Sequence, residues 1–397
     1  MAASTVGVIA ARDVIDDPAL AGASGAAITL GVAAGTSLLA WLMVRLGRRP
    51  GLALGYGIAA AGALLVVWAI GAAAFAPLLG GLFLVGFANS SSSLSRYTSA
   101  ELSTPERRAA AIGLVVWALT IGAIAGPILV PLSAAVAKAA GLDELVGPFF
   151  IASLASLAGA LLLWLRLRPD PDTIAVPEAR TLVDDSNISA RAGAAEQGSD
   201  PMRRILARPP VLTAVVAMVV GQVVMVMIMA MTPLHMRDHG HDFTAVGVVI
   251  SAHMLGMFAL SPISGRIADR FGATATILAS FLTLAIAAVL SAAAPPDGGF
   301  VLLAALFLLG YGWNLGFVAG STLLTNGLRA SERTRTQGFT DSIVWGSSAL
   351  ASLAGGVVLA TVGFEALGVL GALFLILPAW AVLSNRQRLT VVAGSGP

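Results

Sequence analysis

The chain has 397 residues, of which 57% are hydrophobic and 11% are charged, and its formal net charge is +2. Soluble domains carry roughly 25% charged residues, so this composition predicts an integral membrane protein and excludes a soluble globular domain. The small net charge gives no indication of nucleic-acid binding. Because cysteine is absent, disulfides and thiolate metal ligands are also excluded.

The N-terminal segment, residues 1–22, is the weakest candidate for a membrane helix. It offers only about ten apolar residues before Arg12 and Asp13, roughly half the length that a membrane span needs. We therefore expect the first helix to be truncated or to begin upstream of Met1. A secretory signal peptide is not expected, because no basic segment precedes the short apolar stretch.

Eleven apolar runs follow, each near the length of about 20 residues whose helical rise crosses a hydrocarbon core about 30 Å thick. They lie near residues 24–44, 52–73, 76–97, 111–136, 147–166, 210–231, 245–266, 273–294, 299–324, 339–362 and 364–384. The alternating pattern of a membrane β-barrel is absent. The sequence thus predicts an all-α membrane protein of about 12 helices, counting the incomplete first one.

The basic residues orient these helices, because Lys and Arg in short loops stay on the cytoplasmic side. Numbering residues 24–44 as helix 2 places most arginines inside, and of the 23 basic residues only Arg12, Lys138 and Arg237 fall outside. This pattern predicts a multi-pass protein of the bacterial inner membrane with a cytoplasmic C-terminus.

Residues 167–209 interrupt the apolar pattern with Pro, Gly, Ser and many charges, and we interpret them as a cytoplasmic linker. The linker separates an N-terminal helical half, residues 1–166, from a C-terminal half, residues 210–386, with a cytoplasmic tail at 387–397. The halves repeat, since Arg45 matches Arg270 and Gly47 matches Gly272, each pair 225 residues apart.

Two six-helix halves with a charged turn after the second helix of each resemble the major facilitator superfamily. The second copy of its loop motif supplies Gly265, Asp269, Arg270 and Gly272; the first supplies Arg45, Gly47, Arg48 and Arg49, but Ala40 and Val44 replace the motif's Gly and Asp. The resemblance implies a transporter in which these gating loops hold the cytoplasmic helix ends while the halves rock about a central site. Alternatively, Arg48 and Arg49 only satisfy the inside charge rule.

Methionine and histidine gather in one predicted helical hairpin. Residues 218–257 hold eight of the 11 methionines and all four histidines. Gln222, Met225 and Met229 fall on one helical stripe, and a buried amide favours an interior position for that stripe. His253 and Met257 share a face of the next helix, with His253 roughly 13 Å deep. Thioether and imidazole groups suit cuprous copper.

These paired motifs, Met225xxxMet229 and His253xxxMet257, are similar to those of the CcoA-like copper importers within the superfamily. The resemblance implies that the four residues bind copper as the transported substrate, without a resident cofactor. The open alternatives are methionines that only pack or face lipid, and a histidine that bonds a serine or carries protons. The outer loop is expected to hold three histidines, His235, His239 and His241. They could form a site that captures metal ions, or they could simply be solvated.

An exporter of small organic molecules is the main alternative function. Residues 122–127 resemble the front of an antiporter motif, although they also fit ordinary helix packing. Arg96 could bind an anionic substrate or extend to the headgroups, and Asn89 and Asn314, 225 residues apart, could line a cavity with Gln222. We place Asp341 at a cytoplasmic helix end, which leaves no central carboxylate and favours uptake driven by the membrane potential over proton antiport.

The remaining function classes are an enzyme and a degenerate member that no longer transports. An enzyme is not expected, because the spans contain no carboxylate cluster, activated nucleophile or phosphate loop. The degenerate member stays open because helix 1 is incomplete. The expected partners are the lipid bilayer and a small substrate or metal ion, with the protein acting as a monomer.

Overall fold

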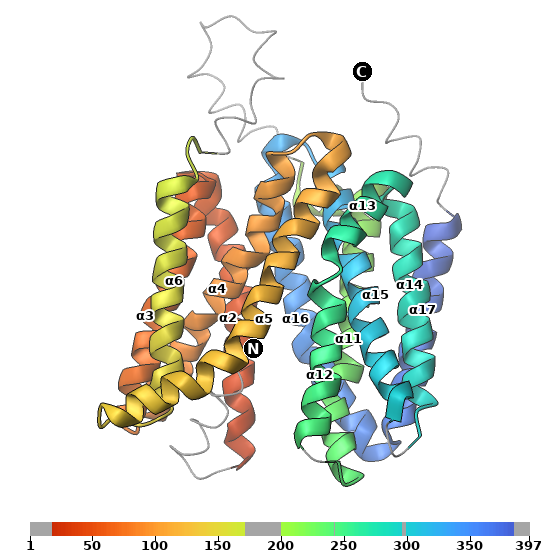
Figure 1. The fold of residues 1–397 in the computed structure, drawn as a ribbon. Helices are drawn as coiled ribbons and strands as arrows, with labels where there is room; N and C mark the ends of the chain where they lie inside the picture. Colours follow the sequence, from red (N-terminus) through yellow and green to blue (C-terminus); the bar gives the residue numbers. More distant parts are fainter. Residues whose placement is uncertain (1–17, 171–199, 242, 296–298, 385–397) are drawn as a thin grey trace, which may run out of the picture. The chain divides into compact units, whose positions relative to one another are not determined.

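A computed structural model describes residues 18–170, 200–241, 243–295 and 299–384. The described part is built of helices, and every predicted apolar run overlaps one or two of them (Figure 1). The all-α fold is therefore confirmed, and ten spans of the described part are long and apolar enough to cross a membrane. The predicted truncation of helix 1 falls largely on residues 1–17, which lie outside the described residues.

The first group of helices precedes the predicted linker. Its members are α2 (Pro18–Leu46), α3 (Arg48–Gly71), α4 (Phe75–Glu101), a short 3-10 helix at Pro105–Arg107, α5 (Arg108–Ala139) and α6 (Val146–Arg166). Most of the linker, residues 171–199, lies outside the described residues. A short helix, α10 (Met202–Leu206), forms within its last part.

The second group begins with α11 (Pro209–Asp238). It continues with α12 (Phe243–Phe258), α13 (Ser261–Phe271), α14 (Ala273–Ala292), α15 (Gly299–Asn326), α16 (Ala330–Thr361) and α17 (Phe364–Ser384). The run at 245–266 is thus two helices with a break at residues 259–260, which the sequence analysis did not predict. Pro262 explains the break, because it has no N–H to donate to the carbonyl of Phe258.

The chain forms two compact units whose boundaries differ from the predicted halves. Unit 1 comprises residues 1–98, 121–199 and 334–346, and unit 2 comprises residues 99–120, 200–333 and 347–397. Unit 1 therefore includes a segment of α16 from the C-terminal half of the sequence. Each unit is described separately.

In unit 1, α3 packs along α6 and α2 packs on α3. A core cluster joins these helices to α4 and includes the buried side chains of Val32, Val66, Leu82 and Phe149. In unit 2, α15 is the central helix and packs on α11, α12 and α14, while α17 covers α14 (Figure 1). A helix that is apolar on all sides belongs at such a buried centre.

The crossing of α12 and α15 depends on two glycines. A Cβ atom on Gly256 would overlap the carbonyl oxygen of Phe307, and one on Gly310 would overlap the carbonyl oxygen of His253. The two backbones therefore approach more closely than any side chain at these positions would allow. This close approach fixes the position of His253 against α15.

Candidate functional site

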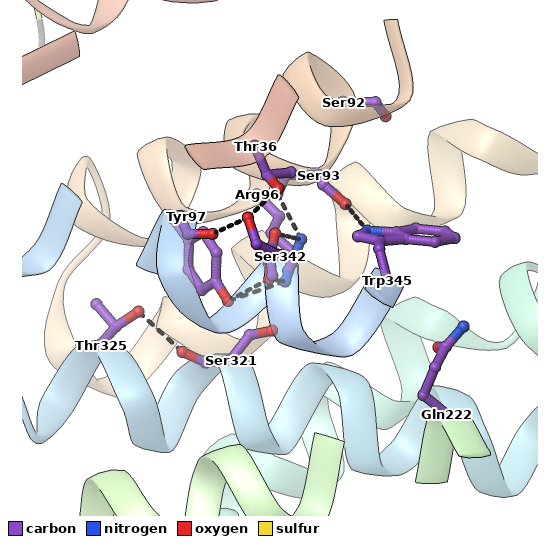
Figure 2. A network of polar contacts seen from close by, with 12 residues as sticks. Thr36, Ser92, Ser93, Arg96, Tyr97, Gln222, Ser321, Thr325, Ser342 and Trp345 are labelled. Carbon is purple, nitrogen blue, oxygen red and sulfur yellow. Dashed lines mark hydrogen bonds and ion pairs between the residues drawn. The ribbon is translucent and has the colours of Figure 1, made fainter. Parts of the chain in front are cut away.

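A segment of α16 is joined to the N-terminal helices of unit 1 by polar contacts. Asp341 accepts two hydrogen bonds from the Arg96 guanidinium, at 2.6 and 3.0 Å, and a third from the Tyr97 hydroxyl at 3.0 Å. One turn away, Trp345 donates its indole N–H to Ser93. Figure 2 shows Arg96, Tyr97 and Ser93 of α4 around this segment.

The same segment contacts α2 and α3. The Ser342 hydroxyl lies 2.7 Å from that of Thr36 on α2 (Figure 2). Arg48, the first residue of α3, donates to Thr334 at 3.0 Å and to Gln337 at 3.4 Å. We call residues 334–346 of α16, together with these partners on α2, α3 and α4, the polar seam.

The structure corrects two expectations about charged residues. Asp341 does not lie at an exposed helix end: it is the twelfth residue of α16 and is fully buried in an ion pair. Arg96 does not extend to the headgroups, because it is only 1% exposed and its guanidinium is bound to that carboxylate. A buried carboxylate is thus present in α16, and the sequence analysis could not detect its partner 245 residues away.

The first copy of the loop motif is the turn between α2 and α3. Gly47 adopts a φ of 94°, a left-handed conformation that favours glycine. Arg48 is buried in the polar seam, whereas Arg45 is exposed and lies over the Trp41 ring of its own helix. The backbone N–H of Arg49 donates to the carboxylate of Asp170, which stabilises the start of α3.

The second copy of the loop motif anchors the start of α5. The Asp269 carboxylate accepts the N–H groups of Ala109 and Ala110, at 3.0 and 2.9 Å. These are among the unsatisfied donors of a helix N-terminus, where a negative charge is also favoured by the helix dipole. Gly265 allows this approach, because a Cβ there would crowd the Ala109 carbonyl. Gly272, with a φ of 86°, then begins α14, while Arg270 lies over its neighbour's ring at Phe271.

A buried polar and aromatic group lies in unit 2. The Trp313 indole donates to the Gln222 carbonyl oxygen at 2.7 Å, and the Gln222 amide nitrogen donates to the Ser348 hydroxyl at 2.7 Å. Trp313 also stacks on Phe317, with ring centroids 4.5 Å apart. Gln222 thus joins α11, α15 and α16, in agreement with its predicted interior position.

The two asparagines with matching sequence positions differ in environment. Asn314 is fully buried in unit 2, where its amide donates to the Met257 carbonyl and to the Ser261 hydroxyl. Asn89 is exposed on α4, and Ser92, one turn further along the helix, is bonded to Tyr56. Of these two asparagines, only Asn89 has an exposed side chain.

The four predicted copper ligands lie on two helices of unit 2. His253 is fully buried and its Nδ1 donates to the Leu306 carbonyl at 2.9 Å. Its Nε2 is buried and has no hydrogen-bond partner among the described residues. Met257 and Met225 are buried and Met229 is half-buried. Helix α12, which carries His253 and Met257, packs mainly on α15 and only slightly on α11, which carries Met225 and Met229.

The predicted outer loop is partly helical. Helix α11 continues through Asp238, so His235 lies in its last turn and is buried, where it stacks on Phe364 of α17 with ring centroids 4.1 Å apart. The loop assignment of His235 was therefore wrong. His239 is exposed and donates from Nδ1 to the His235 carbonyl, while His241 is half-buried. No group of three or more His, Asp or Glu side chains that could hold a metal is found among the described residues.

The comparison with protein families agrees with this arrangement of helices. The family model of the Major Facilitator Superfamily matches residues 1–243 and 223–394 of the chain. The chain belongs to the Major Facilitator Superfamily. As members of this superfamily are transporters, the expectation that the chain is not an enzyme is confirmed.

Bacterial relatives within the superfamily match nearly the whole chain. The uncharacterized MFS-type transporter YdeG of Bacillus subtilis is 34% identical over 97% of this chain and 87% of its own length. The riboflavin transporter RfnT of Brucella anthropi is 29% identical over 91% of this chain and 85% of its own length. The names of these relatives support transport as the function of the chain, and they do not support copper as the transported substrate.

Solved structures of the superfamily share the fold. The proton:xylose symporter XylE matches with a TM-score of 0.71 and 14% identity, covering 96% of this chain and 94% of its own. The human organic anion transporter MFSD10 matches with a TM-score of 0.69 and 18% identity, covering 95% and 88%. At 14% and 18% sequence identity, the similarity to these two structures shows a shared fold and nothing about the transported solute.

Proposed function

We propose that this protein transports a small organic solute with a planar, hydrogen-bonding ring system by alternating access. The observation that carries the proposal is the exposed amide of Asn89. It lies 14 residues into the 27-residue helix α4, roughly 21 Å from its start and close to its midpoint. A polar side chain exposed at mid-membrane favours a solute or water pathway over lipid.

The neighbours of Asn89 provide further groups for such a solute. Ser92 and Tyr56 are half-buried and bonded to each other, and Trp345 is half-buried with its indole N–H on Ser93. Unit 2, taken by itself, contains the Gln222–Trp313 hydrogen bond beside stacked aromatic rings. Amides and indoles next to aromatic faces suit a ligand that both stacks and forms hydrogen bonds.

Riboflavin is the first solute to test, because RfnT, a transporter named for riboflavin, matches over 91% of this chain. The proposal also retains the predicted setting: the cytoplasmic membrane of a bacterium, a cytoplasmic C-terminus and a monomeric transporter.

Uptake of radiolabelled riboflavin tests this proposal in a riboflavin-auxotrophic bacterium that lacks its own transporter. Expression of the native chain is expected to restore uptake. Asn89→Ala should lower initial uptake by roughly two- to tenfold at equal protein level, since a lost hydrogen bond to substrate costs about 0.5–1.5 kcal/mol.

Thr283→Ala is the matched control, because the Thr283 hydroxyl only bonds the Ala279 carbonyl of its own helix. Its uptake should remain native. No riboflavin uptake by well-expressed native protein would exclude this solute, and equal uptake by native protein and Asn89→Ala would exclude Asn89 from the solute path.

Copper uptake is the second candidate function, and the free Nε2 of His253 is the observation that favours it. A histidine that donates from Nδ1 to a carbonyl presents Nε2 as a metal ligand, which is the usual arrangement in metal sites. Met257 lies one helical turn away and would supply a thioether. Met225 and Met229 would have to approach from α11.

Radiocopper uptake in a copper-importer-deficient bacterium tests this candidate. The copper hypothesis predicts uptake that falls to the level of the empty strain in a His253→Ala, Met257→Ala variant. Met227→Ala is the control, because Met227 packs on Gly355 of α16 and should not contribute to binding. Absence of copper uptake by the native protein, or retained uptake in the double variant, would contradict the hypothesis.

A further inference from the structure

We propose that a basic cavity beside the start of α5 binds a phosphate group, carried either by a membrane phospholipid or by a soluble phosphate ester. The cavity has a volume of about 730 Å³ and lies within unit 2. Its walls come from the short 3-10 helix, the start of α5 and the end of α13, and the lining residues are Arg107, Ala110, Arg266, Asp269 and Arg270. The proposal does not depend on which solute the protein transports.

The cavity has an excess of positive charge. Three of its lining residues are arginines and one is an aspartate, which leaves two positive charges in excess. The carboxylate of that aspartate, Asp269, is already occupied, because it accepts the backbone N–H groups of Ala109 and Ala110 at 3.0 and 2.9 Å. The carboxylate of Glu106, in the 3-10 helix, accepts a hydrogen bond from Thr104 of its own loop. Within the described residues, neither carboxylate is ion-paired with an arginine of the cavity.

The three guanidinium groups of the cavity are available to a ligand. Arg107, Arg266 and Arg270 are exposed, and none of them has a hydrogen-bond or ion-pair partner in the part of the chain that the structure describes. Arg270 contacts the ring face of Phe271, with its guanidinium carbon 5.3 Å from the ring centroid. Such a contact uses the flat face of the guanidinium and leaves the N–H groups at its edge able to donate.

The spacing of the arginines suits a single anion. Arg266 and Arg270 are four residues apart on α13, so they lie on one face of the helix, separated by a rise of about 6 Å. Arg107 reaches the same cavity from the 3-10 helix. Like charges gathered around one cavity repel one another, so an anion bound between them relieves the repulsion. The inside charge rule explains arginines at this end of α13, but it does not require them to line one cavity.

A phosphate group matches the cavity in chemistry and in size. The planar guanidinium fork binds phosphate oxygens in pairs, and a phosphate group has enough acceptor oxygens for more than one arginine. The volume of about 730 Å³ lies in the usual range of ligand cavities, so it can also hold the group attached to the phosphate. The charge rule predicts that this end of α13 is cytoplasmic, where both anionic headgroups and soluble phosphate esters occur.

Direct binding to the purified full-length protein in detergent tests the proposal with two probes. Glycerol phosphate, titrated by isothermal titration calorimetry, represents a soluble phosphate ester. Phosphatidylglycerol, added to delipidated protein and followed by native mass spectrometry, represents an anionic headgroup; phosphatidylcholine, which has no net charge, is the reference lipid. Binding of phosphatidylglycerol alone would identify the ligand as a membrane lipid, whereas binding of glycerol phosphate would identify it as a soluble ester.

An Arg107→Gln, Arg266→Gln variant removes two of the guanidinium forks and should weaken binding of the responding probe by at least about tenfold. The matched control is Arg203→Gln with Arg204→Gln, which removes two exposed arginines of α10 that do not line the cavity. The control should bind with native affinity. Binding of neither probe by the native protein, or an equal loss in both variants, would overturn the proposal.

A lysine pair provides a second variant in case the glutamine variant does not accumulate. Arg107→Lys with Arg266→Lys keeps both charges but loses the planar forks, so affinity should fall by a smaller factor than in the glutamine variant. Native affinity in the lysine variant would show that the guanidinium groups do not hold the phosphate. These binding results do not involve riboflavin or copper, so a failure here is distinct from a failure of the proposed function.

Discussion

Replacing Arg96 with leucine is expected to destabilise the protein by about 3–5 kcal/mol, because the fully buried Asp341 would lose its counter-charge. Asp341→Leu should have a similar effect, since it leaves the guanidinium of Arg96 without its carboxylate. The double variant, Arg96→Leu with Asp341→Leu, removes both charges together. It should recover most of the loss, because two apolar side chains can pack in place of a buried ion pair.

Thermal unfolding of the four proteins in one detergent gives the coupling between the two residues as a double-mutant cycle. The expected result is a positive coupling close in size to either single loss. If the two single losses simply added in the double variant, the buried pair would not be an energetic unit. Retention of the native melting temperature by Arg96→Leu would show that the ion pair does not stabilise the fold.

The second large effect is expected at the crossing of α12 and α15. Gly256→Val should destabilise the protein by about 3 kcal/mol or prevent its accumulation, because the Phe307 carbonyl occupies the space that the new side chain needs. Backbone cannot move aside as a flexible side chain would. The crossing also positions His253, so any folded variant should place that side chain differently.

Gly247→Val on the same helix is the control, because no atom lies within 4 Å of a Cβ at Gly247. Both substitutions place a β-branched residue in α12, so their difference isolates the packing effect from helix propensity. Membrane accumulation and melting temperature should fall for Gly256→Val and stay near native for Gly247→Val. Equal behaviour of the two variants would contradict the close crossing.

The helices could be predicted because apolar length is a local property of the sequence. Residues 364–384, for example, are predicted and observed with the same bounds, as α17. Helix α16 instead begins at Ala330, nine residues before the predicted run at 339–362. Its first turns are polar and only partly buried. Gln337 is buried there because Arg48 provides a hydrogen-bond partner that hydropathy cannot detect.

The candidate site could be predicted less well because it depends on contacts between distant parts of the chain. The interior position of Gln222 followed from helical periodicity, and Asp269 followed from the loop motif. The burial of Asp341 and the stacking of His235 on Phe364 depend on residues more than 100 positions away in sequence. The Met and His motifs share helical faces as expected, yet spacing alone could not establish whether the faces of α11 and α12 meet.

Solute exchange by a Thr36→Cys, Ser342→Cys variant tests whether an organic solute crosses only when the polar seam opens. Purified Thr36→Cys, Ser342→Cys protein would be placed in liposomes loaded with unlabelled riboflavin, and entry of labelled riboflavin would be measured. We expect exchange by the reduced protein, its loss on oxidation and its return on addition of reductant. Undiminished exchange by fully cross-linked protein would contradict the role of the seam, and no exchange by the reduced protein would contradict riboflavin as the solute.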